Sequence, residues 1–131
     1  MPDGQHHSHE RLALVVDDSE RILKDACALI EHLGFRVITA RDGETGISLF
    51  IRHRPEFILL DWGLPGMSGL DFLKALRTLP GGERTQVLIC SGNGRPNDIH
   101  LAMRAGASEY LLKPFDEDLL AFKLQQVGLI A

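Results

Sequence analysis

The sequence is poor in cysteine. It contains only two, Cys27 and Cys90, and both lie among apolar residues. Two such residues do not make the framework of a disulfide-stabilised domain, so we expect small buried side chains in a reducing compartment. The first ten residues also lack a basic segment followed by an apolar one, which argues against a secretory signal. These absences favour a cytoplasmic protein.

Long apolar runs and clusters of basic residues are absent as well. No apolar stretch approaches the roughly 20 residues that span a bilayer, so we expect no membrane span. Lys and Arg number 14 against 18 Asp and Glu, which gives a net charge of −4. An acidic domain without a Lys/Arg run lacks the broad basic face that nucleic acids bind. Direct binding of nucleic acid is therefore not expected.

The chain has 131 residues, enough for one domain with one hydrophobic core. Residues 1–10 are polar and include His6, His7 and His9. We predict a disordered N-terminal tail over residues 1–10 and a single folded domain over residues 11–131. The histidine cluster has two other interpretations, a transition-metal site and an engineered tag.

Short apolar runs alternate with amphipathic segments after residue 11. The runs predict buried strands at 12–16, 35–40, 57–60, 86–90 and 109–112. The segments between them predict helices from Ser19 to Gly34 and over 44–53, 69–78, 96–105 and 116–127. Repeated strand–helix units predict an α/β fold with a doubly wound parallel sheet. The functional sites of such sheets lie at the carboxyl ends of the strands.

Polar residues stand at four of these predicted strand ends. They are Asp17 and Asp18 after the first strand, Asp61 after the third, Ser91 after the fourth and Lys113 after the fifth. Each alone has an ordinary structural interpretation, as a helix cap, a turn residue or a solvated lysine. At one edge of one sheet, they together predict a single polar cleft.

The chemistry of this cleft follows from its residue types. Three close carboxylates repel one another unless a cation lies among them, and an all-oxygen ligand set suits Mg²⁺. One carboxylate can then attack phosphorus and form an acyl phosphate. The metal and Lys113 would supply positive charge, and the Ser91 hydroxyl would donate a hydrogen bond to a phosphoryl oxygen.

Four segments resemble the response-regulator receiver domain: VVDDS (15–19), LLDWGLPGMSGLDFL (59–73), CSG (90–92) and GASEYLLKPF (106–115). The resemblance covers about residues 11–130 and is closest to the single-domain, CheY-like chemotaxis type. It implies a flavodoxin-like, CheY-like fold, in which five parallel strands in the order 2-1-3-4-5 carry helices on both faces.

The resemblance also implies roles for the residues of the cleft. Asp61 would be the phospho-acceptor, and Lys113 would bind the phosphoryl group. Asp18 would ligate Mg²⁺ directly and Asp17 largely through water. Asp61 and the backbone carbonyl of Gly63 would complete the metal site.

Ser91 and Tyr110 match the switch pair of the family, a hydroxyl and an aromatic side chain that turns on phosphorylation. The Lys113–Pro114 peptide bond is expected to be cis. Two residues depart from the family pattern, because Gly63 stands where a larger side chain is common and Gly92 where alanine is common. Both concern the lifetime of the acyl phosphate, not its formation.

A receiver of this type is a signalling switch that catalyses only its own phosphorylation and dephosphorylation. The expected donor is a sensor histidine kinase or a histidine phosphotransfer protein. Output is expected through altered contacts with a downstream protein, as in chemotaxis, or through a phosphorylation-dependent dimer. The alternative function is a phosphorelay shuttle that passes the phosphoryl group to a histidine phosphotransfer protein.

Three other interpretations are weaker. A phosphatase of the haloacid dehalogenase type needs an aspartate two residues after its nucleophile, where this sequence has Gly63, and it usually needs a cap domain. A flavodoxin-like or dinucleotide-binding protein would bind phosphate, which the clustered carboxylates repel, and no G-x-G-x-x-G motif follows a strand. A receiver-like scaffold that is never phosphorylated would not need the complete residue set.

The predicted last helix carries two stripes. Leu120, Leu124 and Val127 recur at core spacing, and Leu119, Phe122, Lys123 and Gln126 form a second stripe. In the family, this second stripe lies on the partner-binding face. The expected partner surface comprises Ile99, Tyr110, Leu112, Leu119, Phe122 and Lys123. The alternative is that Leu119 and Phe122 extend the core.

Overall fold

The computed structural model describes residues 11–131. The predictions for residues 1–10, including those for His6, His7 and His9, lie outside the described residues. Strands and helices alternate along the rest of the chain, as predicted. The strands are β1 (Leu12–Val16), β2 (Arg36–Ala40), β3 (Phe57–Asp61), β4 (Gln86–Ser91) and β5 (Glu109–Leu112). The helices are α2 (Glu20–His32), α3 (Gly43–His53), α4 (Gly69–Arg77), α5 (Pro96–Arg104) and α6 (Glu117–Gln126).

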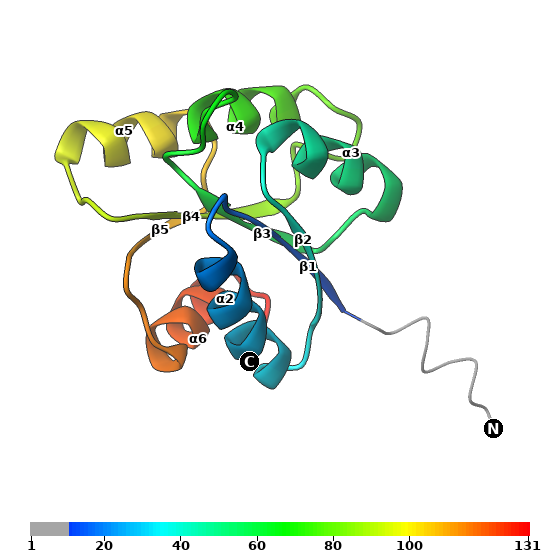
Figure 1. Cartoon of the computed structure of the whole chain (residues 1–131), viewed down its shortest axis with the longest axis vertical. Helices are drawn as coiled ribbons and strands as arrows, with labels where there is room; N and C mark the ends of the chain where they lie inside the picture. Colours follow the sequence, from blue (N-terminus) through cyan, green and yellow to red (C-terminus); the bar gives the residue numbers. More distant parts are fainter. Residues whose placement is uncertain (1–10) are drawn as a thin grey trace.

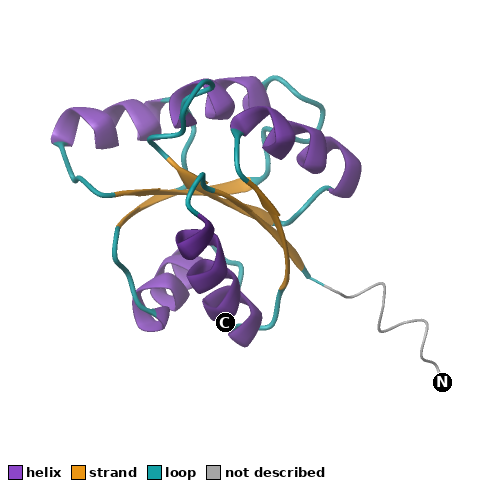
Figure 2. Ribbon diagram, in the orientation of Figure 1, coloured by secondary structure: helices purple, strands orange, loops and turns teal. Residues whose placement is uncertain are grey.

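The five strands form one parallel sheet in the order β2-β1-β3-β4-β5. Helices α3, α4 and α5 cover one face of the sheet, and α2 and α6 cover the other (Figures 1 and 2). The predicted doubly wound architecture and strand order are therefore confirmed. No helix within residues 11–131 has the length and apolar character that crossing a membrane requires.

Each face of the sheet has its own hydrophobic core, because alternate residues of a strand point to opposite faces. In β3, Ile58 and Leu60 pack into the core under α3, α4 and α5. Phe57 and Leu59 pack into the core under α2 and α6. A strand that is buried on both faces has apolar side chains at consecutive positions. The apolar run at 57–60 therefore predicted β3 correctly.

The helix ends also follow local chemistry. The Ser19 hydroxyl caps α2 by accepting a hydrogen bond from the Ile22 amide at 3.3 Å. Gly34, just after this helix, has a φ of 102°, a conformation that few other residues adopt. One burial prediction was partly wrong. Cys90 is fully buried, but Cys27 is only partly buried. The side of α2 that faces the core carries Leu23, Ala26 and Ile30, and Cys27 is not among these buried residues.

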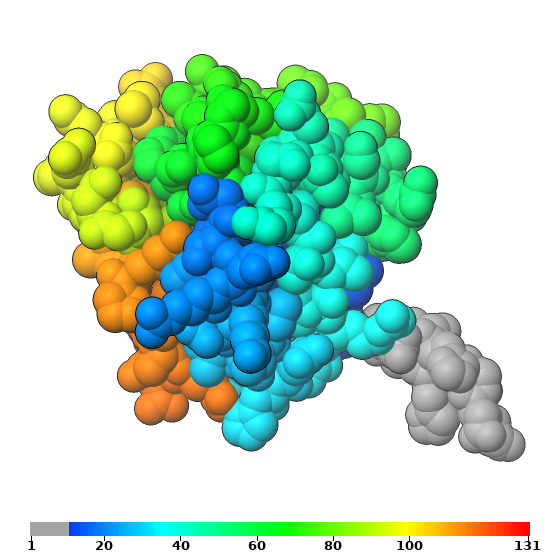
Figure 3. All heavy atoms as spheres, viewed as in Figure 1, coloured from blue at the N-terminus to red at the C-terminus, as the bar shows by residue number. Residues whose placement is uncertain are grey.

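The strand-end loops converge on one face of the molecule. Figure 3 shows the segments that follow β1 (blue), β3 (green) and β5 (orange) meeting there. Parallel strands place all their carboxyl ends at one edge, so the polar residues after these strands become neighbours. The fold thus assembles residues that are up to 96 positions apart in the sequence, as between Asp17 and Lys113.

Candidate functional site

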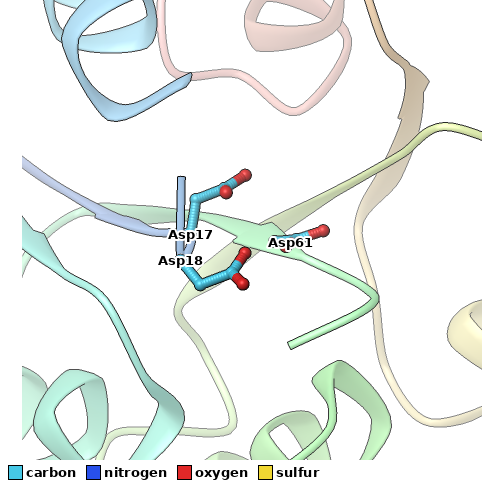
Figure 4. A group of neighbouring side chains, drawn as sticks. All are labelled: Asp17, Asp18 and Asp61. Carbon is cyan, nitrogen blue, oxygen red and sulfur yellow. The ribbon is translucent and has the colours of Figure 1, made fainter. Parts of the chain in front are cut away.

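Three carboxylates gather at the ends of β1 and β3, which are adjacent strands. Asp17 and Asp18 follow β1, and Asp61 is the last residue of β3. One carboxylate oxygen from each lies within 4.8 Å of the others. Figure 4 shows the three side chains projecting from the two strand ends into the same space. The structure therefore brings together all the aspartates that the sequence predicted for the cleft.

Asp17 is the most buried of the three, with 1% of its surface exposed. Its amide donates to the Ala40 carbonyl at 3.1 Å, and its Oδ1 accepts a hydrogen bond from the Ser19 amide at 3.0 Å. Its Oδ2 lies 2.8 Å from Nζ of Lys113. Asp18, by contrast, is exposed at the mouth of the site. Its backbone carbonyl accepts a hydrogen bond from the Arg41 guanidinium at 3.2 Å, a contact that the sequence did not indicate.

Asp61 is buried beside another negative charge. Burial and the Asp17 carboxylate raise its pKa above the ordinary value, although Lys113 and the Gly63 amide oppose the rise. The Gly63 N–H donates to Asp61 Oδ1 at 3.2 Å, and Lys113 Nζ lies 3.3 Å from the same oxygen. A raised carboxylate pKa means that negative charge is poorly compensated at this point, as expected for a site that takes up a cation.

Lys113 reaches the carboxylates from the other side of the site. Its amide donates to the Ser91 carbonyl at 2.8 Å, which ties the end of β5 to the end of β4. Burial alone would lower the pKa of Lys113, but the hydrogen bond to Asp17 and the nearby negative charges raise it, so the ammonium form is favoured. The Lys113–Pro114 peptide bond is cis, as expected.

Ser91 and Tyr110 are connected through Asn93. Ser91 is buried at the end of β4, and its Oγ accepts a hydrogen bond from the Asn93 amide at 3.2 Å. The Tyr110 hydroxyl donates to the Asn93 carbonyl at 3.1 Å. The sequence did not indicate these two hydrogen bonds, which join Ser91 and Tyr110 through one loop residue, because they depend on how the β4–α5 loop folds.

The predicted partner surface is exposed. Phe122 is 51% exposed, Leu112 and Leu119 are also exposed, and Ile99 and Tyr110 are partly buried. Lys123 bonds to Glu109 at 2.8 Å. Leu120 and Leu124 are fully buried, whereas Leu119 and Phe122 lie outside the core. Leu119 and Phe122 are therefore exposed, and the alternative that these two side chains extend the core is wrong.

The donor set fits a magnesium ion. Asp17, Asp18 and Asp61 offer carboxylate oxygens, the ligands that this hard cation prefers. Burial and the nearby Asp17 carboxylate raise the pKa of Asp61, and a divalent cation bound among these groups would stabilise their charged forms. Within residues 11–131, this is the only group of three or more potential ligands that could hold a metal.

Comparison with known proteins agrees with this geometry. The response regulator receiver domain model matches residues 13–125. The phosphate regulon transcriptional regulatory protein PhoB of Escherichia coli K12 is 32% identical over 89% of the chain, but the match spans only 51% of PhoB. The chain thus has about half the length of such curated relatives. Chemotaxis protein CheY of Pseudomonas aeruginosa is 30% identical, with 87% of the chain and 93% of CheY covered.

A solved structure gives the same result. The chemotaxis response regulator CheY4 of Vibrio cholerae superposes with a TM-score of 0.84 at 30% identity, covering 90% of this chain and 98% of CheY4. The region that the family model matches includes β2 to β5 in full, all of β1 but its first residue, and the carboxylate cluster at the strand ends. The chain therefore belongs to the response regulator receiver domain family.

Proposed function

We propose that Asp61 accepts a phosphoryl group from the phosphohistidine of a sensor histidine kinase or of a histidine phosphotransfer protein. The observation that carries this proposal is the position of Asp61, in a three-carboxylate cluster and 3.3 Å from the Lys113 ammonium group. Receiver domains as a family are phosphorylated on an aspartate and bind Mg²⁺ at an acidic pocket. Asp61 is the last residue of β3, and its carboxylate lies beside the Lys113 ammonium group and in the cluster proposed to hold Mg²⁺.

The transfer is a substitution at phosphorus. An oxygen of the Asp61 carboxylate attacks, the P–N bond to the donor histidine breaks, and the imidazole leaves with the bonding electrons. Lys113 holds positive charge beside the phosphoryl oxygens, and the Ser91 hydroxyl donates a hydrogen bond to one of them. The chain catalyses only this reaction and the later hydrolysis of its own acyl phosphate.

Four residues of the chain would hold Mg²⁺. They are Asp17, Asp18 and Asp61 through their carboxylates and Gly63 through its backbone carbonyl. An ion held there would supply positive charge to offset the negative charge of the phosphoryl oxygens. The exposed position of Asp18 at the mouth of the site supports direct contact with the ion, while the bonds of Asp17 to Lys113 and Ser19 support contact through water.

Output follows from the chain of contacts between the site and the surface. A phosphoryl oxygen that draws the Ser91 hydroxyl inward changes the loop at Asn93, which also holds the Tyr110 hydroxyl. This shifts the equilibrium between two positions of Tyr110 and changes the exposed surface between α5, β5 and α6. We propose that a downstream protein, or a second copy of the chain, binds there in a chemotaxis-like response. The two unpaired thiols support a cytoplasmic location.

Phosphorylation by a small phosphodonor tests the proposal directly. Incubation with acetyl phosphate and Mg²⁺, followed by intact mass measurement, should show one added phosphoryl group in the wild type and none in Asp61→Asn. Asp71→Asn, which changes an exposed carboxylate on α4, is the matched control and should be labelled normally. Equal labelling of Asp61→Asn and the wild type would refute the assignment. Transfer from the labelled protein to a histidine phosphotransfer protein would identify the alternative phosphorelay function.

A further inference from the structure

Helices α4 and α5 are neighbours on one face of the sheet (Figure 1). Side chains from both helices line a groove between them. Its volume is about 340 Å³, within the range of small binding sites. It is lined by Leu70, Lys74, His100, Leu101, Arg104 and Ala105. This groove lies apart from the carboxylate cluster, and none of the predicted partner-surface residues lines it.

The groove is positively charged although the chain carries a net charge of −4. Lys74 from α4 and Arg104 from α5 both line it. Across residues 11–131, neither Lys74 nor Arg104 forms an ion pair or a side-chain hydrogen bond. The carboxylates of the two helices, Asp71 and Asp98, occupy the first turns and do not line the groove.

Helix electrostatics explain these cations only in part. Lys74 and Arg104 lie in the last turns of their helices, where a basic residue favourably meets the negative end of the helix dipole. The dipole effect is the same whichever side of the helix carries the basic residue. It does not account for two cations from different helices facing one groove, each without a carboxylate partner.

Apolar residues accompany the charges. Leu101 is 47% exposed and Leu70 is partly buried, and both line the groove. Leu70 precedes Lys74 by four residues, so the two occupy the same side of α4 one turn apart. The groove therefore offers a leucine from each wall together with a cation from each wall, over a length of about one to two helical turns.

We propose that this groove binds an acidic amphipathic helix of a partner protein, whose carboxylates pair with Lys74 and Arg104 and whose apolar side chains contact Leu70 and Leu101. An amphipathic helix laid between two helices is a common mode of peptide recognition. A nucleic acid is less suited, because no Phe, Tyr or Trp lines the groove for base stacking and two leucines do.

A second copy of this chain is also less suited as the occupant. Its most acidic turn, at the start of α6, is already engaged. Asp116 caps the helix by accepting from the Leu119 amide at 2.9 Å, and Glu117 pairs with His32 at 2.6 Å. These contacts leave too few free carboxylates in that turn to match the groove.

The two helices that form the groove both follow strands that end at the phosphorylation site. Peptide binding in the groove nevertheless does not depend on the proposed function. Helix α4 follows β3, which ends in Asp61, and α5 follows β4, which ends in Ser91. A helix seated between them would contact both elements that leave the site. The test below uses unphosphorylated protein, so its outcome is separate from the identity of the phospho-acceptor.

The test is a titration of the full ¹⁵N-labelled chain followed by NMR. The probe is a short helical peptide with glutamates and leucines on one face, and its counterpart has lysine in place of glutamate. The acidic peptide should shift the amide signals of α4 and α5 around the groove. Lys74→Glu/Arg104→Glu should weaken binding of the acidic peptide about tenfold, because each exposed charge pair contributes modestly and is replaced by repulsion. The same variant should gain binding of the lysine peptide.

Two further variants keep the test decisive. Lys74→Gln/Arg104→Gln serves if the charge reversal unfolds the protein, and it should weaken binding of the acidic peptide in the same direction. Lys24→Glu/Arg52→Glu, which changes exposed cations on α2 and α3, should leave the affinity unchanged. Three results would overturn the proposal: shifts that map to other parts of the chain, groove variants that bind the acidic peptide as tightly as the wild type does, or no shifts at millimolar peptide. Groove signals that move with protein concentration alone would instead identify a second copy as the occupant.

Discussion

Gly69 packs directly against the backbone of Trp62, with no space for a side chain between them. Its amide donates to the Trp62 carbonyl at 3.1 Å, and a β-carbon at Gly69 would lie 2.8 Å from Trp62 Cα. It would also lie 2.9 Å from the Asp61 carbonyl oxygen. The start of α4 is therefore seated on the same backbone that carries the proposed phospho-acceptor.

This contact predicts that Gly69→Ala is damaging. The added methyl group would meet backbone atoms, which cannot move aside as a flexible side chain would. We expect the free energy of unfolding to fall by about 1–3 kcal/mol and phosphorylation of Asp61 to slow. Urea denaturation and the rate of labelling by acetyl phosphate measure the two effects. Gly63→Ala is the matched control for the stability measurement, because nothing lies within 4 Å of its β-carbon position. Equal stability of the two variants would contradict the steric argument.

Metal binding should be visible through Trp62. This residue, the only tryptophan, directly follows Asp61 and is partly buried against the core. Neutralisation of the carboxylates changes the electric field at its indole, so Mg²⁺ should change its fluorescence in a saturable way. Asp18→Ala should abolish or greatly weaken this response, while Asp71→Ala should retain it. An unchanged titration in Asp18→Ala would remove Asp18 from the metal site.

The two thiols should differ in reactivity. Burial, together with the charges of Asp17 and Asp61, raises the pKa of Cys90 to about 12. Cys27 is partly buried in a shallow pocket beside Lys24, and burial raises its pKa to a smaller extent. Because the thiolate is the reactive form, iodoacetamide should modify Cys27 slowly, faster as the pH rises, and should modify Cys90 only after unfolding. Peptide mapping of native protein that shows Cys90 alkylated as fast as Cys27 would contradict this burial pattern.

The sequence predicted the sheet and the carboxylate cluster well for one reason. In a parallel sheet, a strand end is recognisable as the point where an apolar run stops, and all such ends share an edge. Asp17, Asp61 and Lys113 could therefore be placed together without coordinates. The short distances from Lys113 Nζ, 2.8 Å to Asp17 and 3.3 Å to Asp61, depend on loop conformation and needed the structure.

Other contacts gave no signal in the sequence. Arg77 donates hydrogen bonds to the backbone carbonyls of Gly82, Thr85 and Gly106, which holds two loops against the end of α4. Backbone carbonyls are present at every residue, so no residue pattern marks such a contact. The partial exposure of Cys27 was missed for a related reason. Its apolar sequence neighbours lie on other sides of α2, because successive residues of a helix are about 100° apart.

The last prediction concerns the exposed stripe of α6. Phe122 is 51% exposed, beside the exposed Leu119, and clustered exposed apolar side chains mark interaction surfaces. Phe122→Asp should therefore weaken binding of the phosphorylated chain to its target, or to itself, by about tenfold or more, as for a central aromatic contact. The free energy of unfolding should change by less than about 0.5 kcal/mol, since the side chain is outside the core. Labelling of Asp61 should be normal.

Ile51→Asp is the matched control, because Ile51 is 49% exposed on α3, away from this surface. Sedimentation velocity of the beryllofluoride-bound forms measures self-association, and mass spectrometry of co-purified proteins compares target binding. Loss of binding in Phe122→Asp with retention in Ile51→Asp is the expected result, whereas normal binding by a folded Phe122→Asp would place the output surface elsewhere.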